Sequence, residues 1–229
     1  MALPPEQQYD SKEKQNGTLA LFIKKTEADL LSALQVESID PYDPVDVSAI
    51  PSPWKTVGAG NYAAVVFHPG FPDWVVKIYA PGRPGLSEEA SVYRKLGPHP
   101  AYSECLHEGK NYLVLKRLKG VTLYDCLHRG IRIPKKVIKD IDDALEYART
   151  RGLHPCDVHG KNVMLVNGRG VVVDVSDFYK TEACSKWEDV KKAYYKVYLP
   201  FFYRFPVPVP YSLLNIVRKG YRFYKKLRK

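Results

Sequence analysis

The spacing of apolar residues between positions 54 and 118 predicts a small sheet. Two runs, 63–67 and 74–79, are rich in β-branched and aromatic residues and are bounded by glycine and proline, which is typical of strands. The same signals predict further strands at 56–57, 105–108 and 112–115. One helix is expected among these strands, over residues 86–96, because Gly97-Pro98 ends its periodic stretch.

Beyond residue 118 the apolar spacing becomes that of helices. A short helix is expected at 122–128 and a longer one from Pro134 to about Arg151, with one apolar face. Two valine-rich runs, 163–166 and 171–173, flank Asn167-Gly168-Arg169-Gly170, which predicts a β-hairpin. A sheet with one helix, followed by helices around a hairpin, indicates an α+β fold in two parts.

The two ends of the chain have patterns of their own. Residues 18–36 carry a rough amphipathic stripe and are expected to form a helix. Four prolines in residues 37–53 indicate a linker, because proline interrupts helices and sheets. Residues 186–229 hold 12 aromatic side chains, and a dense group of them is expected to complete the core of the second part: Tyr194, Tyr195, Tyr198, Phe201, Phe202 and Phe205.

Composition narrows the class of protein. The 229 residues are 45% hydrophobic and 26% charged, which excludes an intrinsically disordered chain. No run of about 18 apolar residues occurs, so no transmembrane helix is expected, and the polar N-terminus has no signal-peptide pattern. The four cysteines match no zinc module and are expected to be reduced thiols. Together these features predict a cytoplasmic protein.

Charge is distributed unevenly along the chain. The net charge is +10, yet residues 1–50 carry −5 and residues 186–229 carry +10. Such asymmetry favours contact between the basic end and an acidic partner. In residues 215–229, basic and apolar side chains alternate in a way that suits an anionic membrane surface, a nucleic acid or an acidic protein segment. A solvated helix face is the alternative interpretation.

A glycine-containing loop and a lysine mark the predicted sheet as a candidate phosphate site. Gly58 and Gly60 lie between two strand signals, where the backbone can fold close to an anion. Lys77 lies within an apolar strand and needs an anionic partner if it is buried. Glu89 shares a helix face with Tyr93 and Leu96, so it is expected to point inward, whereas Glu88 is expected to point outward.

A second group of polar residues surrounds the predicted hairpin. Asp157 and Asn162 precede its first strand, and Asp174 follows its second strand. Because a hairpin brings such positions together, these side chains offer hard oxygen ligands suited to Mg²⁺. One carboxylate could instead accept a proton from a hydroxyl nucleophile. Turn formation is the alternative role, since Asp and Asn are common in turns.

Taken together, these motifs resemble the protein-kinase superfamily. In chain order they are Gly58-x-Gly60-x-x-Ala63-x-Val65, Lys77, Glu89, Pro155-Cys156-Asp157 with Asn162, and Asp174-Val175-Ser176. The resemblance covers residues 54–180. It implies a bilobal fold with an acidic extension and linker at 1–53, a small antiparallel-sheet N-lobe at 54–118, and a shortened helical C-lobe with a basic aromatic tail at 119–229.

The resemblance also implies roles for individual residues. ATP would contact Val57, Gly58, Gly60, Val65, Leu115, Lys116 and Leu118. Lys77 would bind the α- and β-phosphates while Glu89 holds Lys77. Asn162 and Asp174 would bind Mg²⁺ or Mn²⁺, and Asp157 would orient the acceptor hydroxyl and accept its proton, with Lys77 and Asn162 as further catalytic residues. The five polar groups would converge on a triphosphate in a cleft between the lobes.

Several positions depart from the family pattern. Cys156 replaces an arginine, His159 replaces a lysine, Val175-Ser176 replaces Phe-Gly, and no Ala-Pro-Glu motif follows. These traits resemble compact atypical kinases, namely RIO-like proteins, minimal bacterial serine/threonine kinases and lipopolysaccharide sugar kinases. The expected activity is serine/threonine protein phosphorylation. A kinase of a sugar or other small hydroxyl compound, and a catalytically silent scaffold, are the alternatives.

Overall fold

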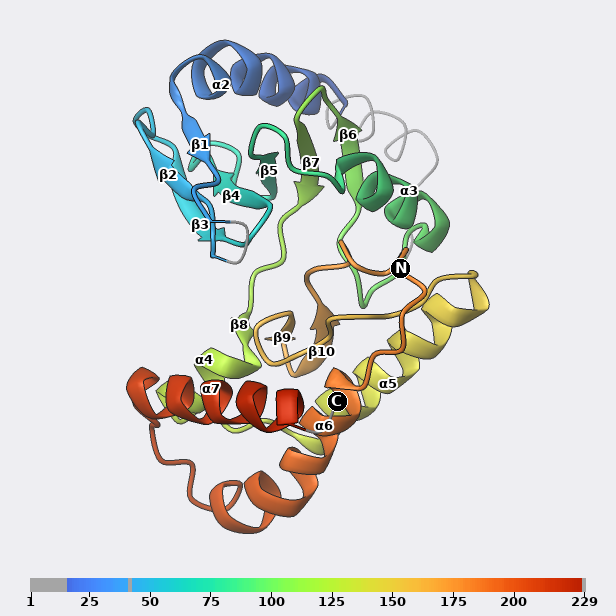
Figure 1. The fold of residues 1–229 in the computed structure, drawn as a ribbon. Coiled ribbons are helices and arrows are strands. Elements are labelled where there is room, and N and C mark those ends of the chain that lie inside the picture. The colour runs from blue at the N-terminus through green and yellow to red at the C-terminus, as the bar shows by residue number, and fades with distance from the viewer. Residues whose placement is uncertain (1–15, 41–42, 228–229) are drawn as a thin grey trace. The chain divides into compact units, whose positions relative to one another are not determined.

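The structure, a computed structural model, describes residues 16–40 and 43–227, with the backbone alone for 222–227 (Figure 1). The chain divides into two compact units. The first unit contains the described residues up to Ala90 together with Cys105–Arg117, and the second contains Ser91–Glu104 and the described residues from Leu118 onward. Helix α3 (Leu86–Leu96), whose bounds match the predicted ones, passes from the first unit into the second.

The first unit is built on a five-stranded antiparallel sheet in the order β3-β4-β5-β7-β6. All five strands were predicted from the apolar runs. Their bounds are β3 (Lys55–Ala59), β4 (Ala63–Phe67), β5 (Trp74–Tyr79), β6 (Cys105–Glu108) and β7 (Tyr112–Lys116). Strand β5 is buried along its whole length, which explains why every position except Lys77 is apolar or aromatic.

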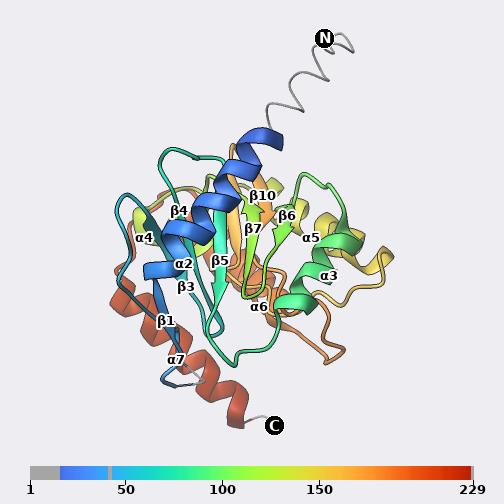
Figure 2. The same cartoon turned by 90° about the horizontal axis from the view of Figure 1, so that it is seen from above.

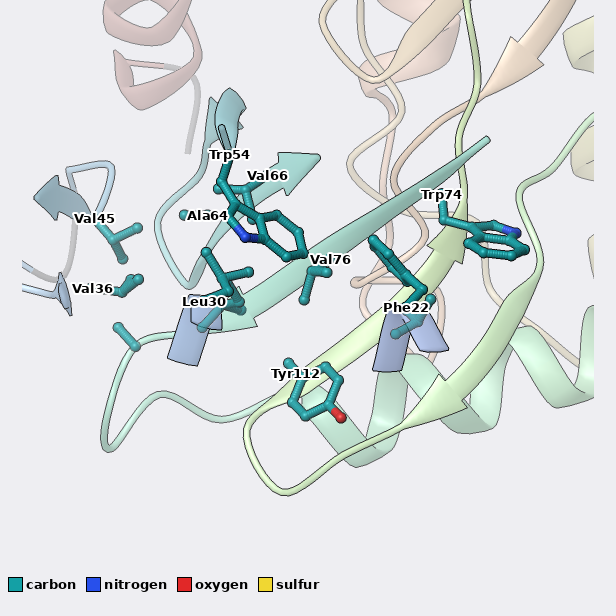
Figure 3. Packing of buried hydrophobic residues seen from close by; sticks show 13 residues of the cluster. Phe22, Leu30, Val36, Val45, Trp54, Ala64, Val66, Trp74, Val76 and Tyr112 are labelled. Atoms are coloured by element: carbon teal, nitrogen blue, oxygen red, sulfur yellow. The ribbon is translucent and has the colours of Figure 1, made fainter. Parts of the chain in front are cut away.

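The N-terminal segment packs onto this sheet and is part of the same core. Residues 16–33 are helical, including the π-helical turn η1 (Thr26–Leu30) and α2 (Leu31–Ala33), and they cross one face of the sheet (Figure 2). Phe22 is fully buried among the rings of Trp54, Phe71 and Trp74, with ring centroids 5.2–5.7 Å apart. Leu30 is equally buried in this core (Figure 3).

Two expectations for residues 1–53 are therefore wrong in the described part. The segment is not an extension outside the sheet domain, because its apolar side chains cover the sheet. The predicted helix also ends early, since Leu34 is extended and Val36 belongs to strand β1 (Gln35–Glu37). Strand β1 pairs with β2 (Asp46–Ser48), which lies inside the predicted linker. Val36 and Val45 are buried in the core, and this burial favours the paired strands over a linker.

The second unit combines a helical body with a small sheet. Helices α4 (Leu123–Arg129) and α5 (Lys135–Thr150) match the predicted helices. The predicted hairpin is present as β9 (Val163–Val166) and β10 (Arg169–Val172), and it gains a third strand, β8 (Val121–Thr122), that was not predicted. A Cβ atom on Gly170 would lie 2.5 Å from the Val137 carbonyl oxygen, so glycine allows α5 to pack closely on β10.

The hairpin is also fixed to α5 by a paired carboxylate. Asp140 accepts two hydrogen bonds from the Arg169 guanidinium, at 2.8 and 3.0 Å, and a third from the Gly170 amide. The pKa of Asp140 is lowered: its burial acts in the opposite direction, but the hydrogen bonds from Arg169 and Gly170 outweigh that effect. Arg169, expected in the turn, instead begins strand β10 after a two-residue Asn167-Gly168 turn.

The remaining helices are α6 (Lys186–Ala193), the π-helical η2 (Tyr194–Phe202) and α7 (Tyr211–Leu227). The prediction that the aromatic group forms core is only partly right. Tyr194 and Tyr198 are buried, with their rings 5.3 Å apart, but a larger number of the predicted core rings are exposed: Tyr195, Phe201, Phe202 and Phe205. Within the part of the chain that the structure describes, no helix has the length and apolar character needed to span a bilayer.

Candidate active site

A buried ion pair lies in the first unit. Lys77, in the middle of β5, has its Nζ 2.7 Å from Oε2 and 2.9 Å from Oε1 of Glu89 on α3. The Glu89 side chain is fully buried and the Lys77 side chain is 11% exposed. Tyr79, two residues after Lys77, donates its hydroxyl to Glu89 as well. Glu89 therefore points inward and holds Lys77, as expected. Glu88, which was expected to point outward, is half-buried.

The glycine loop joins β3 to β4 in the same unit. Val57 is an extra residue in the β3–β4 pairing, and its side chain is half exposed. A Cβ atom on Gly58 would meet no atom within 4 Å, so packing within the protein does not require glycine there. The Gly60 amide donates to the Ala63 carbonyl at 2.9 Å, and the Gly60 carbonyl accepts from Val45. The Gly60 amide is thus engaged within the loop, whereas Gly58 faces open space.

The other predicted nucleotide contacts lie on neighbouring strands or just beyond them. Val65 is opposite Lys77 in the β4–β5 register and is partly buried. Leu115 is buried on β7 opposite Val75, and Lys116 is exposed at the end of that strand. Leu118 belongs to the second unit.

A loop in the second unit holds Asp157 and Asn162 together. The Asn162 side-chain Nδ2 donates to the Asp157 carbonyl at 3.0 Å, and the Asn162 amide donates to the His159 carbonyl at 2.8 Å. Asp157 has a positive φ of 56°, a left-handed conformation that Asp and Asn adopt more readily than most residues. Because Nδ2 is used by the loop, Oδ1 of Asn162 is the atom that can bind a cation.

Asp174 lies next to Asn162 at the open end of the β9–β10 hairpin. The Val173 amide donates to the Asn162 carbonyl at 3.0 Å, which brings the two chain segments side by side. The Asp174 Oδ1 atom accepts from the Ser176 amide at 3.0 Å, which orients the carboxylate. The structure therefore brings Asp157, Asn162 and Asp174 together in one unit, as the hairpin argument predicted.

Two basic side chains surround the Asp157 carboxylate. Lys186, the first residue of α6, contacts Oδ1, and His159 Nε2 lies 3.8 Å from Oδ2. Burial lowers the pKa of His159, although the charge of Asp157 acts in the opposite direction. This shift disfavours the charged form of His159, and Lys186 is the other basic side chain in contact with Asp157. Sequence reasoning missed Lys186 because it is 29 residues from Asp157 and no motif connects the two.

Comparison with known proteins shows which family the chain belongs to. No family model matches the sequence. A Bacillus subtilis protein named "Putative serine/threonine-protein kinase YrzF" is 33% identical over 169 residues, which cover 73% of this chain and 72% of that protein. The chain belongs to the protein-kinase-like superfamily. Two solved structures of the Mycobacterium tuberculosis PknI kinase domain, a single and a double mutant, are each 22% identical with a TM-score of 0.39. The matches cover 53% of this chain, which spans only 57% and 56% of those two chains.

Two positions that depart from the kinase motifs, His159 and Cys156, can now be compared with the structure around them. Lys161, the lysine nearest in sequence to the position that His159 occupies, has its Nζ 4.7 Å from the centre of the Tyr124 ring. Lys186 is the lysine that contacts Asp157. Cys156 occupies the arginine position of the motif, and the amide of the next residue, Asp157, donates to Cys184 Sγ at 3.2 Å. Burial is the main cause that raises the pKa of Cys156 to about 12, so this thiol stays protonated at neutral pH.

Proposed function

We propose that this kinase-like protein is an ATP-dependent phosphotransferase, specifically a serine/threonine protein kinase. The observation that carries the proposal is the gathering of Asp157, Asn162 and Asp174 at one end of the β9–β10 hairpin. Turn formation accounts for any one of these residues, but two carboxylates and an amide side by side also offer the oxygen ligands and the proton acceptor that phosphoryl transfer uses. The name of the Bacillus subtilis relative supports the same activity and favours a protein acceptor.

Lys77 and Glu89 are proposed to fix one positive charge for the phosphates of ATP. The buried carboxylate of Glu89 holds the Lys77 ammonium in place, so no reorganisation is needed when the α- and β-phosphates bind. The open space beside Gly58 leaves room for the nucleotide near the loop of Val57, Gly58, Gly60 and Val65. The proposed adenine contacts are Leu115, Lys116 and Leu118.

Asn162 and Asp174 fit a hard divalent cation, Mg²⁺ or Mn²⁺. Both carry side-chain oxygen atoms, and one hydrogen bond orients each side chain: Asn162 donates to the Asp157 carbonyl, and Asp174 accepts from the Ser176 amide. Among the described residues, no three His, Cys, Asp or Glu side chains gather closely enough to hold a metal ion by themselves. The remaining ligands would then be water and phosphate oxygens, as is usual for Mg²⁺. When bound, such an ion offsets the charge that develops between the β- and γ-phosphates.

Asp157 is proposed to act on the acceptor. Its carboxylate accepts the hydroxyl proton while the acceptor oxygen forms a bond to the γ-phosphorus and ADP leaves with the bridging oxygen. Lys186 contacts this carboxylate and is proposed to hold it in position until the acceptor arrives. The Lys186 ammonium is also proposed to stabilise negative charge on the transferred group, because it contacts Asp157.

A small-molecule hydroxyl is the second candidate acceptor. Only residues 175–185 separate Asp174 from helix α6, so the segment available to bind a peptide acceptor is short. This favours a compact acceptor, whereas the name of the Bacillus subtilis relative favours a protein. Radiolabel transfer to both kinds of acceptor distinguishes a protein from a small molecule.

The test is transfer of radiolabel from [γ-³²P]ATP by the purified full chain with Mg²⁺. The acceptors are the protein itself, a generic basic protein and a panel of sugars. We expect label on protein serine or threonine, and at least about 100-fold less with Asp174→Asn, because a catalytic metal supplies several kcal/mol of charge stabilisation. Asp143→Asn, which changes an exposed carboxylate on α5, is the matched control and should transfer normally.

Label on a sugar alone would favour the second acceptor. Binding of ATP with no transfer to any acceptor, in a protein that is fully folded, would overturn the phosphotransferase and leave a nucleotide-binding scaffold.

A further inference from the structure

Helix α7 lies on the second unit with its polar side inward. Tyr124 of α4 donates its hydroxyl to Asn215 Oδ1 at 2.9 Å, and the Tyr211 hydroxyl donates to Asp125 Oδ1 at 2.8 Å. The Tyr211 ring also stacks on His128, with 3.6 Å between the ring centroids. Near its other end, the Tyr221 hydroxyl donates to Asp189 Oδ2 of α6. These polar contacts hold α7 along α4 and α6 (Figure 1).

The opposite side of α7 is apolar and faces solvent. Leu213, Ile216 and Val217 follow the i, i+3, i+4 spacing of one helix face, and they are 50%, 65% and 63% exposed. A helix docked on a globular protein normally turns its apolar stripe toward the core. Since α7 does the reverse, packing within the second unit does not account for the apolar stripe.

The preceding segment exposes apolar side chains in the same way. Phe201 and Phe205 are 70% and 73% exposed, and Val207 is 59% exposed. The chain here is nevertheless anchored, because Arg132 donates to the Tyr203 carbonyl at 3.0 Å and the Val209 amide donates to the Leu127 carbonyl at 3.0 Å. Two consecutive and anchored segments therefore present unpartnered apolar side chains. We call this group the C-terminal apolar surface, and its members are Phe201, Phe205, Val207, Leu213, Ile216 and Val217.

The charge of this region indicates what covers the surface. Residues 190–229 contain 11 Lys/Arg and no Asp/Glu. A second copy of the chain would bring the same positive charge against it, so self-association through this surface is disfavoured. An anionic partner is favoured, and the exposed aliphatic and phenyl groups further require an apolar phase to enter. Nucleic acid offers no such phase to leucine, isoleucine and valine, whereas an anionic bilayer offers both.

We propose that the C-terminal apolar surface binds the interface of anionic phospholipid bilayers. Leu213, Ile216 and Val217 enter the boundary between headgroups and acyl chains, Phe201 and Phe205 add a second exposed apolar group, and the basic residues of segment 190–229 favour the anionic phosphates. The helix lies in the plane of the interface, with its polar side still attached to the second unit. This inference is independent of phosphoryl transfer, because none of the residues that carry it belongs to the candidate active site.

The test is co-sedimentation of the full chain with vesicles of phosphatidylcholine alone or with 30% phosphatidylglycerol. We expect the wild type to bind the anionic vesicles at least about tenfold more tightly, and to lose most of that preference in 0.5 M NaCl, where charges are screened within about 3–5 Å. The double variant Ile216→Ser/Val217→Ser should bind anionic vesicles at least about tenfold more weakly than the wild type, both without added NaCl and in 0.5 M NaCl. Ile39→Ser is the control, because Ile39 is 77% exposed in the first unit.

The substituted side chains are exposed, so the variants should fold, and thermal unfolding followed by circular dichroism checks this. Phe201→Ser/Phe205→Ser provides a second, independent pair in η2 and the segment after it. Equal vesicle binding by wild type, both double variants and Ile39→Ser would overturn the proposal. Heparin, an anionic polymer without an apolar phase, gives a second check. The proposal would also be overturned if wild type bound heparin as tightly as anionic vesicles and if the serine variants lost heparin binding by the same factor as vesicle binding.

Discussion

Replacing Asp157 with Asn is expected to lower phosphoryl transfer by about 10²–10⁴-fold, the usual contribution of a positioned general base. The amide keeps the size of the carboxylate but cannot accept the hydroxyl proton. Asn also tolerates the left-handed backbone at φ 56°, so the loop should keep its shape. The measurement is single-turnover transfer from [γ-³²P]ATP, with the ATP dissociation constant measured in parallel. The rate should fall while ATP binding stays within about twofold of the wild type.

Two further variants separate catalysis from loop structure. Asp157→Ala should lose both activity and stability, because alanine carries the full cost of a left-handed backbone, roughly 1–2 kcal/mol. Asp143→Asn should change neither, because its carboxylate is exposed on α5. Retention of more than about a tenth of the wild-type rate by Asp157→Asn would contradict the role of Asp157 as proton acceptor.

The buried Lys77–Glu89 pair predicts a second large effect, on stability and activity at once. Lys77→Met leaves the fully buried Glu89 carboxylate without its ammonium, and Glu89→Leu leaves Lys77 without its carboxylate. Breaking a buried pair by removing one partner costs about 3–5 kcal/mol. The double variant Lys77→Met/Glu89→Leu should recover most of this loss, because an apolar replacement removes both charges. All three variants should lack phosphoryl transfer, because Lys77→Met removes the ammonium and Glu89→Leu removes the carboxylate that holds it in place.

Chemical denaturation measures the stability of each variant, and radiolabel transfer measures its activity. The double variant is decisive, because it is expected to be folded and inactive, which separates the role of the pair in phosphate binding from its role in stability. Tyr79, which donates to Glu89 in the wild type, can keep the Gly85 carbonyl, 3.4 Å from its hydroxyl, as an acceptor. Lys139→Met is the control, since the Lys139–Asp143 pair is exposed and contributes little to stability. An active double variant would contradict the proposed role of Lys77.

The central sheet and the main helices could be predicted from the sequence because their signals are local. Strands β4 and β5 are apolar runs, interrupted only by Lys77, that are bounded by glycine and proline, and α3 ends just before Gly97-Pro98. Strands β1 and β2 were missed because each is three residues long and β2 lies among prolines. Their formation depends on the burial of Val36 and Val45 against distant parts of the chain, which a local pattern does not contain.

In the candidate site, too, the contacts with a local signal could be predicted and the purely tertiary ones could not. The inward orientation of Glu89 follows from helix periodicity, and its contact with Lys77 was expected from the kinase resemblance. The proximity of Asn162 and Asp174 follows from the hairpin. Lys186 was missed because its contact with Asp157 is purely tertiary. The exposure of Phe201 and Phe205 was missed because composition alone does not tell which aromatic side chains of a segment face inward.

The most direct test of the account is a crystal structure of the full chain with Mn²⁺ and a non-hydrolysable ATP analogue, with the metal located by its anomalous signal. We predict that Asn162 and Asp174 ligate the metal, that Lys77 binds the α- and β-phosphates of the same nucleotide, and that Asp157 faces its γ-phosphate. A nucleotide and metal bound by other residues, with these side chains turned away from the triphosphate, would contradict the account.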